Sequence, residues 1–176
     1  THVLSGWCLS NFFTLTVRER FFCMLAAGLP DLDGITYIFG HEAYWDTHHI
    51  MGHNFLFAII ASLILSAFST SRIKCFSIYI ALFHLHLLMD LFGSGMGWGI
   101  AYYWPFSKRI VEISYYWELY SWQNILAGIF FIGWTWLIIL QKKRTPLEYI
   151  MPELDRKLTT FFNKKRTDNT DATELH

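Results

Sequence analysis

Residues 75–92 read CFSIYIALFHLHLLMDLF, an apolar run that carries two histidines and an aspartate toward its end. The run approaches the about 20 helical residues needed to cross a bilayer core. His86 and Asp90 are four residues apart, so on a helix they share one face, whereas His84 points to roughly the opposite side. Ionisable groups are costly to bury in a membrane and mark functional sites. The segment therefore predicts a membrane helix that supplies a polar pair to a site.

The composition of the chain supports a membrane protein. Hydrophobic residues make up 53% of the 176 residues and charged residues only 16%, against about 25% in soluble domains. The charged residues also crowd into 141–176, so the preceding part is more apolar still. The formal net charge is zero, which argues against a nucleic-acid partner. The three cysteines form no CxxC pair and are expected to pack among apolar neighbours.

Five apolar segments predict the architecture. They cover residues 3–17, 21–30, 55–70, 75–92 and 124–140. The last two approach the length of a membrane span, the third is slightly short, and the first two are marginal. We expect an all-α, membrane-embedded bundle of four to five apolar helices, occupying residues 1–145 as one domain. Residues 146–176 are expected to form a polar helix followed by a disordered tail at 167–176.

Basic residues predict the orientation of this bundle. The turns TVRER (16–20), STSRIK (69–74) and QKKRTP (141–146) fall on one side of an up-and-down arrangement. The positive-inside rule makes that side cytoplasmic, together with the C-terminal tail. Lys108 and Arg109 are exceptions in the long loop on the other side.

The remaining polar residues converge on the non-cytoplasmic end of the same arrangement. They are His2, Asp31, Asp33, His48, His49, His53, His86 and Asp90. Imidazole and carboxylate groups are ordinary Zn²⁺ ligands, and a cation would compensate groups that are expensive to bury unpaired. The sequence therefore predicts a divalent-metal site at this end. If residues 48–53 are helical, His49 shares a face with His53; if they form an extended turn, His48 is the better placed residue.

Other readings of these polar residues stay open. Asp31 and Asp33 also suit helix caps or turns around Pro30 and Gly34. His41 and His84 are expected to make ordinary hydrogen bonds, and His176 lies in the tail.

Five motifs in order resemble the YdjM-like family of membrane-bound, metal-dependent hydrolases. They are TH at 1–2, LPDLDG at 29–34, HHIMGHN at 48–54, HLLMD at 86–90 and WPFS at 104–107. The family writes its histidine pair as H-x4-H, which implies His48 and His53 as ligands. Gly52 and Asn54 depart from the Thr and Ser usual beside that pair. The resemblance implies a location in the bacterial inner membrane.

The order of motifs is also similar to that of the zinc-dependent phospholipase C and single-strand nuclease superfamily. That similarity implies His2, Asp31 or Asp33, His53, His86 and Asp90 as ligands. Because the chain has a single H-x3-D, we expect one or two zinc ions. Such an ion activates water for attack on a phosphoester. One of Asp31 and Asp33 would then bind metal while the other acts as general base or orients a histidine.

The loop after residue 92 suggests the substrate. Its aromatic residues at 98–122 fit an interfacial belt at headgroup depth, which favours a membrane lipid. Ser94 lies in a glycine-rich turn that a headgroup could approach, and Lys108 and Arg109 could contact a lipid phosphate. Two other functions compete with a hydrolase: a metal transporter or sensor that uses the same ligands, and a structural membrane protein whose polar groups only bond one another.

Overall fold

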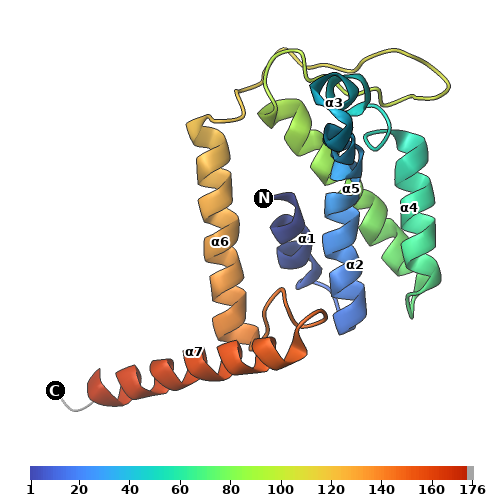
Figure 1. The fold of residues 1–176 in the computed structure, drawn as a ribbon. Coiled ribbons are helices and arrows are strands. Elements are labelled where there is room, and N and C mark those ends of the chain that lie inside the picture. The colour runs from blue at the N-terminus through green and yellow to red at the C-terminus, as the bar shows by residue number, and fades with distance from the viewer. Residues whose placement is uncertain (174–176) are drawn as a thin grey trace.

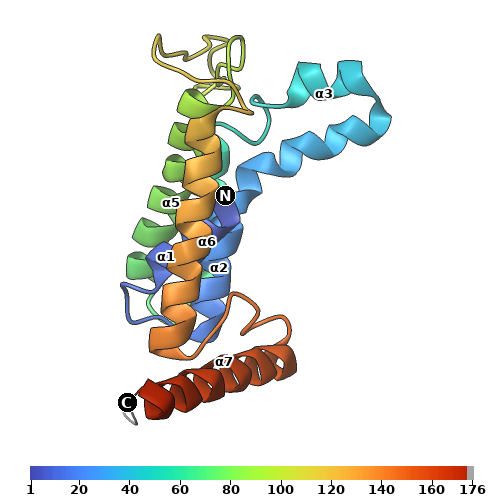
Figure 2. The same cartoon turned by 90° about the vertical axis from the view of Figure 1, so that its left-hand side faces the viewer.

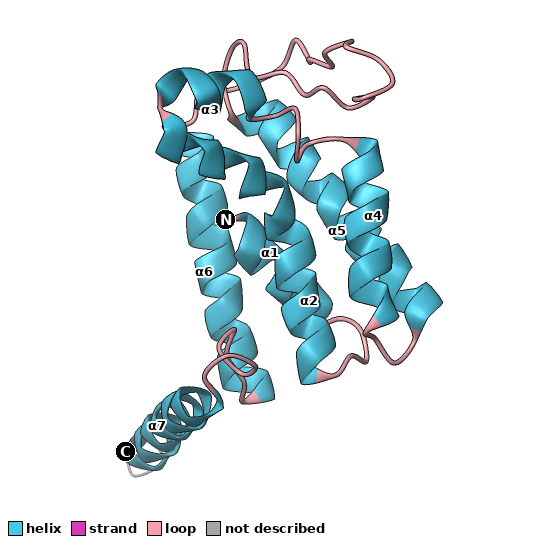
Figure 3. Cartoon of the chain, turned by 45° about the vertical axis from the view of Figure 1, so that its right-hand side comes forward, coloured by secondary structure: helices cyan, strands magenta, loops and turns pink. Residues whose placement is uncertain are grey.

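The computed structural model describes the backbone of residues 1–173 and the side chains of residues 1–162. The described chain is helical, and its only β-type pairing is one antiparallel bridge between Ile100 and Val111. The elements are α1 (His2–Ser10), α2 (Val17–Gly28), the 3-10 helix η1 (Leu29–Phe39), α3 (His41–Thr47), α4 (Phe55–Ala67), α5 (Arg72–Gly93), α6 (Trp122–Lys142) and α7 (Pro152–Thr173). The predicted all-α class is confirmed (Figures 1 and 3).

Small residues hold α1 and α2 close together in the centre of the bundle. A Cβ on Gly6 would lie 2.5 Å from the backbone oxygen of Cys23 and 2.8 Å from Cβ of Ala27. The other face of α2 packs on α5, which packs in turn on α4, while α6 packs on α1. The close packing of α1 on α2 places the start of α1, and with it His2, against the end of α5.

Three helical stretches are long and apolar enough to cross a membrane: Val17–Phe39, Arg72–Gly93 and Trp122–Lys142. The expected helix at 55–70 forms as α4 but is shorter than a bilayer is thick. The first apolar segment also yields a shorter helix than 3–17, because α1 ends at Ser10 and Asn11 donates its side-chain N–H to the oxygen of Trp7. Two of the predicted helices are therefore supporting elements rather than spans.

The stretch Val17–Phe39 bends where α2 gives way to η1. Thr16 and Glu19 form a capping box that starts α2. Pro30 has no N–H to continue an α-helix, and the chain proceeds as a 3-10 helix. Figure 2 shows η1 and α3 projecting from the bundle as an arm. The bend turns the LPDLDG motif toward the end of α5.

The charged turns meet at the opposite end of the bundle, as predicted. Arg20 pairs with Glu148, Lys74 donates to the oxygen of Thr14, and Lys142 donates to the oxygen of Asn11. From this end α7 runs across the base of α6 (Figures 1 and 2), and the rings of Trp136 and Phe162 lie 4.6 Å apart.

The expectation of a disordered tail at 167–176 needs correction, because α7 continues to Thr173. The helix begins at Pro152 with acidic residues in its first turn, a favourable helix start, and its polar continuation extends the same helix. Residues 174–176 lie outside the described part.

Candidate metal centre

The predicted site residues come from four separate parts of the chain and meet at one end of the bundle. His2 starts α1, Asp31 and Asp33 lie on η1, and His86 and Asp90 lie on the last two turns of α5. His48, His49 and His53 lie in the connection between α3 and α4. The convergence predicted from the charged turns is present in the fold.

Asp90 is at the centre of this group. Its Oδ2 lies 2.8 Å from Nε2 of His86 and 3.1 Å from Nε2 of His53. Its Oδ1 lies 3.3 Å from Nε2 of His2. The two Nε2 atoms of His53 and His86 are 3.3 Å apart, and Oδ1 of Asp31 is 3.5 Å from Nε2 of His86. We call Asp31, His53, His86 and Asp90 the central cluster, since one ligand atom of each lies within 4.8 Å of the others.

The outer nitrogens fix the tautomers of the two cluster histidines. Nδ1 of His86 is 2.7 Å from the backbone oxygen of Ala27, and Nδ1 of His53 is 2.9 Å from Oδ2 of Asp33. Carbonyl and carboxylate oxygens only accept hydrogen bonds, so both Nδ1 atoms donate. In a neutral imidazole the other nitrogen then carries a lone pair. Two lone pairs therefore face the same carboxylate, an arrangement that requires a cation or additional protons.

In the absence of a metal, a proton can supply that positive charge. Burial opposes the charged form of His53, but the hydrogen bonds and charges of Asp33 and Asp90 raise its pKa to about 9. His49 behaves in the opposite way, because burial and the nearby charge of His53 lower its pKa to about 4. A proton and a metal ion therefore compete for the central cluster, whereas His49 stays neutral and remains a ligand candidate.

Asp33 forms a second group whose hydrogen bonds are already complete. Its Oδ1 accepts from Nδ1 of His48 at 2.6 Å, and its Oδ2 accepts from Nδ1 of His53 and from the backbone N–H of Gly52 at 2.9 Å. The side chain is buried. Three donors around one carboxylate make Asp33 an orienting group for the histidines, whereas Asp31, half exposed at 51%, faces the central cluster.

The structure separates His48 from His49. His48 binds Asp33, whereas Nε2 of His49 lies 3.9 Å from Oδ2 of Asp90 and its Nδ1 donates to the oxygen of Trp98. His49 has a φ of 67°, in the left-handed region that non-glycine residues rarely adopt. The spacing of the histidines within residues 48–53 could not identify this conformation, which turns His49 rather than His48 toward Asp90.

Local hydrogen bonds hold the connection that carries these histidines. Asn54 caps α4 by accepting from the N–H of Phe57, and its side-chain amide donates to the oxygens of Ile50 and Met51. The backbone N–H of Ala101 donates to the oxygen of His49. Gly52 lies so close to η1 that a Cβ there would be 2.2 Å from the oxygen of Pro30. The departures from the family pattern at Gly52 and Asn54 thus have structural roles.

A cavity of about 420 Å³ opens beside the central cluster. The residues that line it are His2, Asp31, Tyr44, Trp45, His48, His49, Asp90, Ser94, Trp98, Glu118, Leu119 and Tyr120. Ser94, a predicted substrate residue, is among them. Lys108 and Arg109 are exposed and do not line this cavity. The sequence pointed to aromatic residues in this loop, but not to the stacking of Trp45 on Trp98 at 4.3 Å that walls the cavity.

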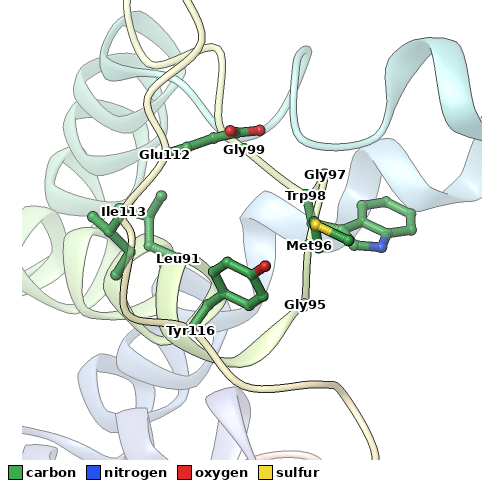
Figure 4. A pocket seen from close by; sticks show the side chains of 9 residues that line it. All are labelled: Leu91, Gly95, Met96, Gly97, Trp98, Gly99, Glu112, Ile113 and Tyr116. Carbon is green, nitrogen blue, oxygen red and sulfur yellow. The ribbon is translucent and has the colours of Figure 1, made fainter.

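A separate pocket behind the glycine-rich loop is far smaller, about 40 Å³. Leu91, Ile113 and Tyr116 lie on one side and the chain from Gly95 to Trp98 on the other (Figure 4). Gly95 has a φ of 94°, and a Cβ there would be 2.5 Å from a carboxylate oxygen of Glu118. The glycine thereby allows Glu118 to approach the loop.

His41 and His84 lie outside the cluster. His41 accepts from the indole N–H of Trp45 at 3.2 Å. His84 donates from Nδ1 to the oxygen of Ile80, and its Nε2 bonds the hydroxyl of Tyr102. Their predicted roles as hydrogen-bonding residues are confirmed, and His176 lies outside the described residues.

Fold and site together define an all-helical membrane protein with a histidine–aspartate cluster at one end of its bundle. The model of the YdjM inner membrane protein family matches residues 1–152, and the chain belongs to that family. It is therefore an integral protein of the inner membrane. Comparison with curated proteins and with solved structures gives no match.

Proposed function

We propose that this chain is a metal-dependent hydrolase that cleaves a phosphoester of a membrane lipid. The observation that carries the proposal is the inward orientation of the Nε2 atoms of His53 and His86 toward the carboxylate of Asp90, with both Nδ1 atoms held from outside. A purely structural cluster would pair each acceptor with a donor. Here the donors lie on the outside, and the inside collects atoms that bind cations.

The donor set fits a zinc ion in both chemistry and spacing. Two imidazole nitrogens and two carboxylate oxygens are ordinary zinc ligands, with bonds of about 2.0–2.2 Å. Tetrahedral ligands on such bonds lie ~3.3 Å apart. The separations among His53, His86 and Asp90 are 2.8, 3.1 and 3.3 Å, and Oδ1 of Asp31 lies 3.5 Å from Nε2 of His86. His53, His86 and Asp90 would hold this ion and leave its fourth position to water, with Asp31 beside it. Oδ1 of Asp90 faces His2, so His2 and Asp90 would hold a second ion.

The residues around the ligands orient the imidazoles and accept a proton. Asp33 and the carbonyl of Ala27 hold the imidazoles of His53 and His86 in the ligating tautomer, as outer hydrogen-bond partners do in zinc enzymes. Asp31 is half exposed, so it can accept a proton from a water that enters the cavity. A bound divalent ion supplies Lewis acidity and lowers the pKa of such a water.

Two features favour a membrane lipid over a soluble phosphoester. The cavity lies at the ends of helices that are long and apolar enough to span a membrane. Its walls include Tyr44, Trp45, Trp98 and Tyr120, and tyrosine and tryptophan are enriched at headgroup depth.

The test combines metal analysis with a lipid assay on purified protein. We expect one to two equivalents of zinc after gentle purification, and chelator-sensitive release of headgroup or phosphate from phospholipid vesicles. Asp90→Asn and His86→Ala should lose both metal and activity. His84→Ala is the matched control, because His84 lies on the same helix but outside the cluster and should keep both.

Three outcomes would reject the proposal. Substoichiometric metal in the folded wild type would contradict the metal site. Stoichiometric metal without hydrolysis across a lipid panel would contradict catalysis, and metal flux in proteoliposomes would then favour transport. Insensitivity of stability and every assay to chelator would favour a structural role.

A further inference from the structure

A second cavity of about 330 Å³ adjoins the metal-site cavity between the start of α1, the end of α5 and the start of α6. The two share five lining residues: His2, Asp90, Ser94, Leu119 and Tyr120. Beyond them the second cavity extends along Met89, Gly93 and Ala127. The shared residues place the second cavity directly beside the metal-site cavity.

Beyond the shared residues, the second cavity is lined by Met89, Gly93 and Ala127 and by the polar residues Thr1 and Asn124, where α5 ends and α6 begins. Among the described residues that line it, Asp90 is the only acidic one, and it belongs to the shared inner part. Both α5 and α6 are long and apolar enough to cross a membrane. In a membrane, a cavity between two such helices lies within reach of lipid.

The packing of α6 keeps this cavity open. Along its length α6 packs on α1 and, at its base, on α7, and Figure 1 shows it standing apart from α5. At the top Asn124 connects the two helices, donating to the oxygen of Gly93 at 2.8 Å and accepting from the indole N–H of Trp117. The Asn124 contacts fix the width of the gap at its upper end.

We propose that this cavity is a lateral binding site for a hydrocarbon chain of the lipid substrate. The inference rests on the proposed function, because the phosphoester must reach the central cluster while the chain stays in apolar surroundings. The lipid enters sideways from the leaflet, its chain lies along Met89 and Ala127, and its headgroup lies in the metal-site cavity. Such a route needs no extraction of the lipid into water.

Photolabelling tests the site without requiring catalysis. The probe is phosphatidylethanolamine with a diazirine in one acyl chain, incorporated in nanodiscs with the full-length protein after metal chelation. We expect labels on peptides that contain Met89, Leu119 and Ala127. Ala127→Phe should fill the cavity and reduce this labelling at least fivefold. Gly128→Phe is the control, because a Cβ at position 128 has no neighbour within 4 Å.

The results separate this inference from the proposed function. Equal labelling in Ala127→Phe and Gly128→Phe, or labels spread evenly over α4 and α6, would overturn the lateral site. Cavity labelling without hydrolysis of any lipid would support the site and reject the hydrolase. In an active protein, Ala127→Phe should lose hydrolysis of long-chain lipid but keep that of a water-soluble short-chain analogue. An unchanged helical circular-dichroism signal and unfolding midpoint verify folding of each variant, and Ala127→Leu replaces Ala127→Phe if the larger side chain prevents folding.

Discussion

The two ends of the bundle both bury charged residues, yet they arrange them differently. At the base, Arg20 donates from Nε and Nη2 to the two carboxylate oxygens of Glu148 at 2.6 and 2.5 Å, and from Nη1 to the oxygen of Leu15. Glu19 accepts from the backbone N–H groups of Thr16 and Thr70. At the other end, the acceptors of His53, His86 and Asp90 face one another.

This difference distinguishes a structural cluster from a binding site. When each buried charge is paired inside the protein, the pairing contributes to the fold and leaves no charged group free to bind a ligand. A cluster that places its donors outside and its acceptors inside is complete only with a cation. The base should therefore govern stability, and the histidine–aspartate end should govern metal binding.

The largest effect on stability is expected when the ion pair between Arg20 and Glu148 at the base is broken. Arg20→Ala leaves the carboxylate of Glu148 without its partner and should lower the free energy of unfolding by about 3–5 kcal/mol. Denaturation in detergent measures it. Arg156→Ala is the control, because the Arg156–Glu153 pair is over 70% exposed on both sides and should contribute about 0–1 kcal/mol. Loss of zinc from folded Arg20→Ala protein would contradict the separation of the two ends.

A smaller effect is expected at Gly52, where the connection that carries His53 lies close to Pro30. Gly52→Ala places a methyl group against the oxygen of Pro30 and should cost about 1–3 kcal/mol through overpacking, with weaker zinc binding. Gly34→Ala should be tolerated, since its nearest neighbour is 3.6 Å from the added carbon. Unfolding and zinc titrations of the two variants compare them. Equal behaviour would contradict the tight contact.

Removing the orienting carboxylate should affect metal binding more than folding. Asp33→Asn replaces an acceptor of three hydrogen bonds with an amide that cannot satisfy all three donors. We expect zinc affinity to fall about 10–100-fold, the usual effect of losing an outer partner of a ligating histidine. Competition with a chelator of known affinity measures it. An unchanged affinity would show that Asp33 does not orient His53.

The pH dependence tests the same cluster without a substitution. Below a pKa of about 9 for His53, zinc must displace a proton, so its apparent affinity should rise up to about tenfold per pH unit and level off near pH 9. In the metal-free protein the His53 imidazolium stabilises the fold fully below its ordinary pKa of about 6.5 and loses this contribution as pH rises toward 9. Titrations at several pH values test both trends, and a flat affinity between pH 6.5 and 8.5 would contradict proton displacement.

The sequence predicts the helices and the end of the bundle where polar residues gather, because both follow from local patterns. Apolar length identifies α5 and α6, and the basic turns fix which ends lie together. The roles of Asp31 and Asp33 could not be assigned, since they depend on the bend from α2 into η1. The orientation of His49 rather than His48 toward Asp90 depends on a left-handed backbone and a bond to Trp98, which is distant in the chain.

The second cavity could not be predicted from the sequence either. It depends on how far α6 stands from α5, which the packing of α6 on α1 determines. Met89 and Ala127 appear as ordinary apolar residues in their own helices.

X-ray absorption of the zinc-loaded protein tests the central claim most directly. The account predicts a first shell of nitrogen and oxygen at about 2.0–2.2 Å, with imidazole scattering from at least two histidines. Cys8, Cys23 and Cys75 are buried elsewhere in the bundle. A sulfur shell near ~2.3 Å, or no zinc retained by the folded protein, would contradict it.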